Sequence, residues 1–291
     1  MIAPSELILN SDGSIYHLGL KPEQVSDKVV IVGDPGRVAE VSSRFSSKEF
    51  EIQNREFFSC TGMFRGKRIT VASTGIGTDN VDIFMNELDA LVNIDLSSRT
   101  VKIQKKSLSI VRIGTSGALQ EDIPVDSFVV SQFGMGLDVL MNYYRGARSV
   151  HDSGLQQQFL LQFEWPDMLH KPLFFEADES LYQLIGGDMP GGITATAPGF
   201  YAPQGRQLRL KPIIMEIEEN LGKMKFYSLS CGDTRITNFE METSALYGLS
   251  LLMGHKACTV CAIVANRIRK EYSKDHKKCT AGLIDLVLER I

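Results

Sequence analysis

The chain has 291 residues, a formal net charge of −4 and 43% hydrophobic residues, so it can bury a sizeable core. The slight acidity argues against a nucleic-acid groove or a basic membrane surface as the partner. No apolar run approaches the roughly 18 residues of a membrane span, and the N-terminus has no pattern typical of an export signal, so a cytoplasmic protein is expected. No linker-like stretch divides the chain, so one domain over residues 1–291 is the expectation.

The five cysteines do not have the spacing of a disulfide framework. Cys258 and Cys261 lie in a strand-like segment, where side chains three residues apart point to opposite faces. We therefore expect buried thiols rather than a redox or metal pair, and no metal site.

The first strand is predicted at residues 28–32, whose sequence KVVIV is typical of a strand buried on both faces. It runs into the turn Gly33–Arg37, and residues 38–45 favour a short helix. A strand, a glycine-rich turn and a helix start present backbone N–H groups and a positive dipole end to an anion. Gly33 lets a ligand approach the backbone closely, and the Arg37 guanidinium adds a bidentate donor.

The next segments repeat the pattern of a strand followed by glycine. Residues 51–68 favour extended hairpin structure, and residues 69–73 form the next buried strand. The glycine loop 74–77 follows. A helix is predicted from there to about residue 92, because its apolar side chains recur at helical spacing.

A third buried strand, residues 109–113, contains Arg112 and is predicted to end in the loop 114–117, whose sequence is GTSG. A permanently charged guanidinium at the end of a buried strand needs an anion, a carboxylate or carbonyl groups beside it. The hydroxyls and free N–H groups of the loop suit an oxyanion such as phosphate. An ion pair with an internal Asp or Glu explains the same arginine equally well, so both interpretations stay open.

Residues 192–197 form a predicted strand that continues into the loop 198–206, which carries Phe200, Gln204 and Arg206. An amide both donates and accepts hydrogen bonds, so it suits the edge of a planar heterocycle, and an aromatic ring can stack on its face. A polar surface loop with anchoring aromatics has the same composition and remains the alternative.

Glu240 and Glu242 bracket Met241 immediately before a helix predicted at residues 244–252. A carboxylate at a helix N-terminus can accept two hydroxyl hydrogen bonds, as from the cis-diol of a ribose. The alternative is that both acids are ordinary helix caps.

The alternation of strands and helices predicts an α/β protein with a central, mixed but largely parallel β-sheet flanked by helices. A further strand at residues 256–264 and a last helix at residues 279–291 extend the pattern. Because parallel strands end at the same edge of a sheet, the glycine loops are expected to form one ligand site there. Residues 140–190 show no clear pattern.

Eight short segments occur in the order and at the approximate spacing found in the uridine phosphorylases of the nucleoside phosphorylase superfamily. Between about residues 16 and 267 they are YHLGL, GDPGR, NREF, STGIG, RIGTSGAL, FYAPQGR, NFEME and VANR. The resemblance implies a single-domain nucleoside phosphorylase-like fold with a family-variable insertion at about residues 140–190. It also implies a pentosyltransferase that converts a pyrimidine nucleoside, uridine above all, and phosphate into uracil and ribose 1-phosphate.

The resemblance further implies the roles of individual residues. The implied phosphate ligands are Gly33, Arg37, Arg112, Thr115 and, from a neighbouring subunit, Arg55. The implied nucleoside contacts are Phe200 on the base, Gln204 and Arg206 on the uracil edge, Met241 and Glu242 on the ribose, and a neighbour's His17 on the 5′-hydroxyl. Among these, Arg112, Arg206 and Glu242 are the implied catalytic residues.

Residues shared between subunits imply a homo-oligomer, a dimer or a hexamer, that acts on small molecules and not on nucleic acid or membranes. No cofactor is implied, because inorganic phosphate is a co-substrate. Some bacterial members hold a monovalent cation between subunits at the positions of Glu56, Ile76 and Asn80. Here the sequence GTDN at residues 77–80 replaces the usual GGPS, which leaves that site an open alternative.

Other functions remain as alternatives. Purine nucleoside phosphorylases of this superfamily have an Asp near the position of Asn266, whereas a nucleosidase uses water and needs no phosphate-binding arginines. A non-catalytic nucleoside-binding protein would keep the pocket without turnover. A nicotinamide-dependent oxidoreductase is disfavoured, because GDPGRV does not match the G-x-G-x-x-G spacing.

Overall fold

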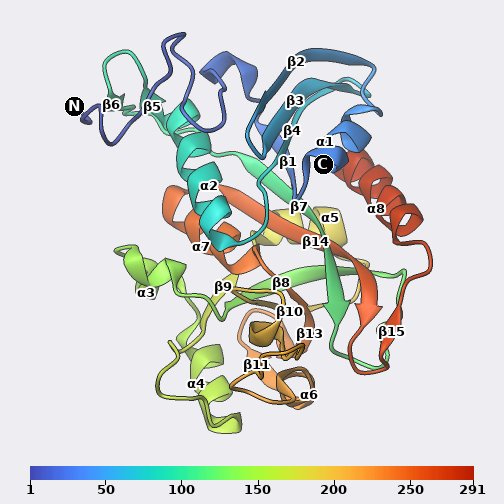
Figure 1. Ribbon diagram of the computed structural model, residues 1–291. Helices are drawn as coiled ribbons and strands as arrows, with labels where there is room; N and C mark the ends of the chain where they lie inside the picture. Colours follow the sequence, from blue (N-terminus) through green and yellow to red (C-terminus); the bar gives the residue numbers. More distant parts are fainter.

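One large β-sheet forms the centre of the protein. The computed structural model describes residues 1–291 and has eleven strands in this sheet (Figure 1). They are β1 (Lys28–Val32), β2 (Ser47–Asn54), β3 (Phe57–Phe64), β4 (Lys67–Ser73), β7 (Ser109–Ala118), β8 (Phe128–Gly136), β9 (Leu173–Glu176), β10 (Gly191–Thr196), β13 (Ile236–Glu240), β14 (Lys256–Asn266) and β15 (Glu271–Tyr272). Two small ribbons lie outside it, β5 (Ile94–Asp95) with β6 (Thr100–Val101) and β11 (Phe226–Ser228) with β12 (Gly232–Thr234).

The strand order is β15-β14-β8-β10-β13-β7-β1-β4-β3-β2, β9 pairs with β8, and β14 also pairs with β7. Strands β4, β1, β7 and β14 are parallel to one another, whereas pairs such as β7–β13 and β8–β14 are antiparallel. The sheet is therefore mixed. It holds a second parallel set, β8, β10 and β13, which runs opposite to the first. Only strands within one set end at the same edge, so the prediction of one common edge holds for β4, β1, β7 and β14.

Helices cover both faces of the sheet. They are α1 (Pro35–Ser42), α2 (Thr78–Asn93), α3 (Ala147–Val150), α4 (Ser153–Gln162), α5 (Glu179–Gly186), α6 (Ile217–Lys223), α7 (Thr243–Met253) and α8 (His276–Arg290), with short 3-10 helices at Pro22–Gln24, Leu140–Tyr143 and Ala202–Gln204. Val29 and Ile31 of β1 pack in the core with α2 and α7, whereas Val30 and Val32 pack with α1, α5 and α8 (Figure 1). This alternation explains why β1 is apolar throughout.

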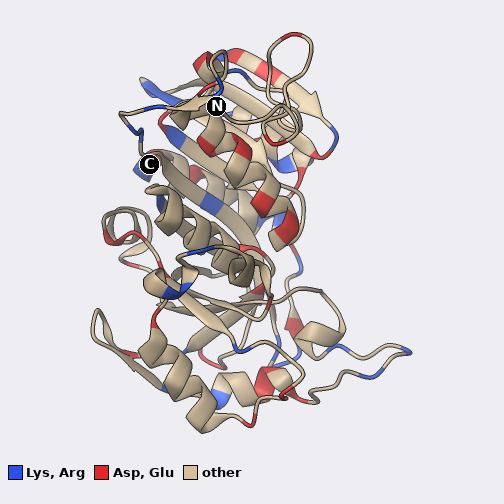
Figure 2. Cartoon of the chain, turned by 90° about the vertical axis from the view of Figure 1, so that its left-hand side faces the viewer, with Lys and Arg blue, Asp and Glu red and all other residues tan.

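Charged residues of both signs occur along most of the chain (Figure 2), whereas the charged residues of α2 are all acidic. None of the helices combines the length and the apolar composition that crossing a membrane requires.

The predicted α/β fold is confirmed, but two boundaries next to the candidate site were wrong. The strand at Arg112 does not end at residue 113, because β14 pairs with β7 up to Ala118. Gly114 lies within this strand, opposite Cys261. A side chain there is excluded, because a Cβ would collide with the Arg112 guanidinium and lie 2.8 Å from Cys261 Sγ. Helix α1 begins at Pro35, because the Asp34 carboxylate caps the Arg37 N–H and proline suits the first helical turn.

Residues 140–190 contain ordered elements that the sequence did not reveal. The segment contributes β9 to the main sheet and includes α3, α4 and α5. Trp165 packs against Phe159 and Phe163 and donates a hydrogen bond to the His170 carbonyl. These aromatic side chains join a hydrophobic cluster that β8, β10 and β13 of the main sheet also line.

Candidate active site

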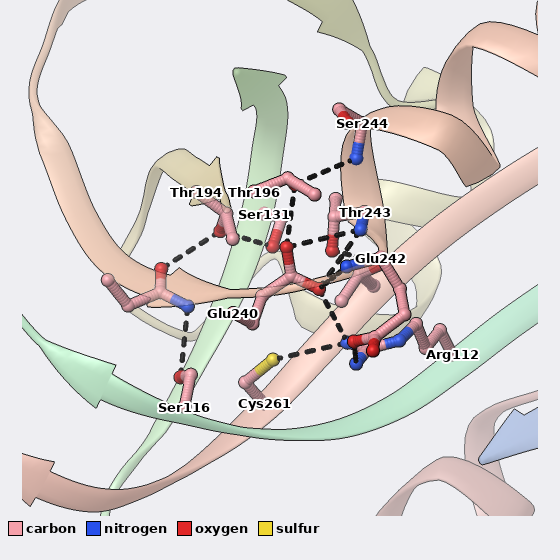
Figure 3. Close-up of polar contacts among 12 residues, drawn as sticks. Arg112, Ser116, Ser131, Thr194, Thr196, Glu240, Glu242, Thr243, Ser244 and Cys261 are labelled. Carbon is pink, nitrogen blue, oxygen red and sulfur yellow. Dashed lines mark hydrogen bonds and ion pairs between the residues drawn. The ribbon is translucent and has the colours of Figure 1, made fainter. Parts of the chain in front are cut away.

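Arg112 is the centre of a buried charge cluster (Figure 3). Its side chain is 5% exposed, Nη1 lies 3.1 Å from Glu240 Oε2, and Nη2 contacts Glu242 Oε2. Nη1 also lies 3.7 Å from Cys261 Sγ. The internal ion pair that the sequence left open is therefore present. Of the five guanidinium N–H donors, Nε–H and one Nη2–H have no partner within the chain and could still bind an oxyanion.

The two glutamates have different tasks. Glu240 accepts hydrogen bonds from the backbone N–H groups of Glu242 and Thr243 at 2.9–3.1 Å and from the Thr196 hydroxyl at 2.7 Å, so it caps α7. The Glu242 carboxylate instead accepts the Gly77 N–H at 2.8 Å and pairs with Arg112. Sequence reasoning did not assign Glu240 to the site, although two acids directly before a helix were the available signal.

Burial raises the pKa of Glu242, and the neighbouring Glu240 acts in the same direction, whereas Arg112 opposes the shift. Met241 is half-buried at the same junction between β13 and α7. The predicted ribose contacts, Met241 and Glu242, therefore lie in one short segment that β13 precedes and α7 follows.

Arg37 lies beside this cluster. Its Nη1 donates to the Ile113 carbonyl of β7 at 3.3 Å, and its Nη2 lies 3.3 Å from Asp34 Oδ2. Burial lowers the pKa of Arg37; Asp34 opposes the shift and the nearby charge of Arg112 adds to it. Because Arg37 bonds the carbonyl of the residue that follows Arg112, both cations lie on the same stretch of β7, and an anion bound there would relieve their repulsion.

The other predicted phosphate ligands have space for a ligand. A Cβ built on Gly33 would meet no atom within 4 Å, and the Thr115 hydroxyl makes no hydrogen bond within the chain. The N-terminus of α1 is less available than expected, because the Asp34 carboxylate already accepts the Arg37 N–H. The dipole of α1 therefore faces an internal carboxylate.

The structure brings Phe200, Gln204 and Arg206 into one group. The Arg206 guanidinium lies 3.8 Å from the centroid of the Phe200 ring and donates to Gln204 Oε1 at 2.6 Å and to the Phe200 carbonyl at 2.7 Å. Gln204 is buried, whereas Phe200 is 51% exposed. Burial, together with the charge of Arg267, lowers the pKa of Arg206 to about 10. The three side chains therefore contact one another, with the guanidinium over one face of the ring and bonded to the amide oxygen.

Arg267 and Glu218 adjoin this loop and were missed as site residues. Arg267 Nη2 donates to the Gln204 carbonyl at 2.9 Å and to Glu218 Oε1 at 3.2 Å, and its buried Nη1 has no partner. The polar residues at the end of the strand could have indicated Arg267 as a site residue. Nothing in the sequence indicated Glu218, because its proximity to Arg267 depends on the tertiary fold.

His17 and Arg55 form a separate group at the turn between β2 and β3. His17 Nδ1 lies 2.7 Å from Glu87 Oε1 on α2, and Arg55 Nη2 lies 3.5 Å from the hydroxyl of Tyr16, whose ring it covers. Arg55 is exposed and has a φ of +56°. No hydrogen bond or ion pair joins His17 or Arg55 to Arg112 or to the loop at Gln204.

Comparison with known proteins identifies the family. The sequence model described as "Phosphorylase superfamily" matches residues 27–285. The chain belongs to this superfamily. A uridine phosphorylase of Thermococcus kodakarensis is 30% identical over 270 residues, which cover 92% of this chain and 83% of the relative. A purine nucleoside phosphorylase of the DeoD type from Oceanobacillus iheyensis is 25% identical, and the match covers 94% of this chain and 98% of the relative.

A solved structure of similar fold is that of the Trypanosoma brucei nucleoside phosphorylase, a protein that shows uridine phosphorylase activity. Its TM-score to this chain is 0.88 at 28% identity, and the match covers 98% of each chain. This superfamily member therefore has relatives of both the pyrimidine and the purine type, and its own residues must distinguish them.

Asn266 lies near the position at which the family resemblance implies an Asp in purine enzymes. It is buried, its Nδ2 donates to the Gln120 and Ile123 carbonyls at 2.9 and 2.8 Å, and its Oδ1 accepts the Ile268 and Arg269 N–H groups. Two of these hydrogen bonds hold the turn after β14 and two tie it to the segment after β7, so the amide is occupied within the chain. An amide also carries no acidic proton that it could transfer to a purine.

Proposed function

We propose that the protein catalyses the phosphorolysis of a pyrimidine nucleoside, with uridine as the substrate and uracil and ribose 1-phosphate as the products. The observation that carries this proposal is the position of Arg112. It touches Glu242, a candidate acceptor for ribose hydroxyls, and it retains two free N–H donors for phosphate. The ion pair of Arg112 with Glu242 can thus hold the two reactants side by side.

The chemistry requires little beyond these groups. As a phosphate oxygen attacks C1′ of the ribose, the N-glycosidic bond breaks and its electron pair leaves with the base. Positive charge develops on the ribose, where phosphate and the Glu242 carboxylate stabilise it. The uracil anion spreads its charge over two carbonyls, to which Arg206 and Gln204 can donate. Fixing both reactants in one pocket supplies the entropic part of the rate enhancement.

Phosphate is proposed to bind Gly33, Arg37, Arg112 and Thr115. The exposed Arg55 and the neighbouring His17 support the proposal that a homo-oligomer, a dimer or a hexamer, completes each site with these two residues from an adjacent subunit. The proposed reaction uses inorganic phosphate as a co-substrate and no organic cofactor.

We propose that no monovalent cation binds at Glu56, Ile76 and Asn80. The Asn80 amide donates to the Ile76 carbonyl at 3.2 Å, so this oxygen already has a partner. Residues 140–190 are proposed as the family-variable segment within a single domain over residues 1–291.

The test follows ultraviolet absorbance of uridine and of inosine, each with and without phosphate. We expect loss of uridine only when phosphate is present, and no loss of inosine. Cleavage of uridine without phosphate would indicate a nucleosidase. Preferential cleavage of inosine would contradict the assignment of Gln204 and Arg206 to the uracil edge.

A further inference from the structure

A buried ion pair lies directly beneath the loop that carries Gln204 and Arg206. Glu218, in the first turn of α6, is 8% exposed, and its Oε1 lies 3.2 Å from Arg267 Nη2. The same Nη2 donates to the Gln204 carbonyl at 2.9 Å. Moving the Glu218 carboxylate would therefore move the arginine that supports the loop.

Glu218 also touches the backbone of the loop. Gly205, which joins Gln204 to Arg206, has a φ of +74°, and a Cβ on it would collide with Glu218 Oε2 and lie 3.4 Å from Glu218 Cδ. The carboxylate thus occupies the space that a glycine leaves open. This close packing fixes the distance between α6 and the loop that carries Gln204 and Arg206.

Glu218 is one carboxylate with two cations beside it. Arg267 lies 3.2 Å and Lys270 lies 3.6 Å from its Oε1, and Arg206 lies close enough to Arg267 for that charge to lower the pKa of Arg206. The Glu218 carboxylate therefore binds Arg267 and Lys270, and Arg267 in turn lies near the charge of Arg206. Without it, the buried Arg267 would lose its ionic partner and be repelled from Arg206.

We propose that Glu218 is a positioning residue for recognition of the nucleobase, which acts by holding Arg267 and Gly205 so that Gln204 and Arg206 face the base together. This inference rests on the proposed function. Helix α6 has no direct role in the reaction. The proposal is that it affects binding of the nucleoside and not binding of phosphate.

The test compares Glu218→Gln with Glu219→Gln in the full-length protein. The two substitutions remove the same charge from the same helical turn, but Glu219 forms no ion pair or hydrogen bond through its side chain. We expect Glu218→Gln to lower kcat/KM for uridine roughly 10- to 100-fold, mainly through KM for uridine, with KM for phosphate unchanged. Glu219→Gln should match the wild type.

A double-mutant cycle separates positioning from general destabilisation. If Glu218 acts through Arg267, adding Glu218→Gln to Arg267→Gln should change kcat/KM by less than about twofold. Melting temperatures of all variants check that each is folded. Equal effects of the two single glutamate substitutions, an equal rise of KM for phosphate, or additive effects in the cycle would overturn the proposal. Absence of pyrimidine cleavage by the wild-type protein would instead overturn the proposed function.

Discussion

Glu240 Oε2 lies 3.1 Å from Arg112 Nη1, so a helix-capping carboxylate also anchors the candidate phosphate arginine. The same oxygen accepts the Glu242 N–H at 2.9 Å. One buried glutamate therefore fixes the relative positions of the two side chains that would hold phosphate and ribose. The site is preorganised by the junction between β13 and α7, rather than assembled from independent loops.

Replacing Arg112 with Ala should reduce kcat/KM for uridine by about 100- to 1000-fold, because it removes donors that face developing charge. It also leaves Glu240 and Glu242 without their cation, so we expect the free energy of unfolding to fall by about 3–5 kcal/mol. Steady-state kinetics and urea denaturation measure the two effects. Arg112→Lys, which keeps the charge without the planar fork, is the control and should be intermediate; wild-type rates in Arg112→Ala would contradict the phosphate pocket.

Asn266→Asp should not create a purine enzyme. The aspartate cannot donate to the Gln120 and Ile123 carbonyls, so each loses a buried hydrogen bond. We expect a loss of about 1–3 kcal/mol in the free energy of unfolding and no gain of inosine cleavage. The exposed Asn142→Asp serves as the matched control, with little effect on stability. Appearance of inosine phosphorolysis in Asn266→Asp would show that the amide is not confined to its structural role.

Gly205→Ala should be more harmful than Gly13→Ala. Both glycines have positive φ, +74° and +83°, but a Cβ at Gly13 meets nothing within 4 Å, whereas one at Gly205 meets Glu218. The Gly13 variant therefore reports backbone strain alone, about 1 kcal/mol. We expect Gly205→Ala to cost more stability and to raise KM for uridine. Equal melting temperatures and equal KM values for the two variants would argue that the loop adjusts freely.

The buried thiols should resist modification in the native protein. Burial raises the pKa of Cys261 to about 11 and that of Cys258 further, so the reactive thiolate is scarce at pH 7 to 9. Raising the pH within this range should therefore not make these two thiols react promptly. In a thiol titration, half-buried Cys231 should react first, and all five should react in denaturant. Prompt native reaction of Cys258 and Cys261 would contradict their burial.

Much of the fold follows from local pattern. The apolar strand at residues 28–32 and the helix from Thr78 are where periodicity predicts them, and Gly254 ends α7 with a φ of +78°. The strand at Arg112 was cut short because GTSG is typical of a loop. Its pairing with β14 keeps it extended, and a local sequence window does not contain that partner.

The candidate site was less completely predictable for the same reason. Phe200, Gln204 and Arg206 stand close together in the chain, so their grouping was foreseeable. Glu218 reaches Arg267 only because α6 packs beneath the loop, and the sequence separation of 49 residues gives no sign of it. Likewise, the sequence alone allowed either phosphate or an internal carboxylate as the partner of the Arg112 guanidinium. The positions of Glu240 and Glu242 in the structure identify the internal partners.

The most direct test of phosphorolysis identifies the sugar product. Phosphorus-31 NMR of a reaction with uridine and inorganic phosphate should show ribose 1-phosphate forming at the rate at which uracil appears, one for one. That result would establish phosphate as the nucleophile. Release of uracil with free ribose and unchanged phosphate would contradict the account and assign the attacking group to water.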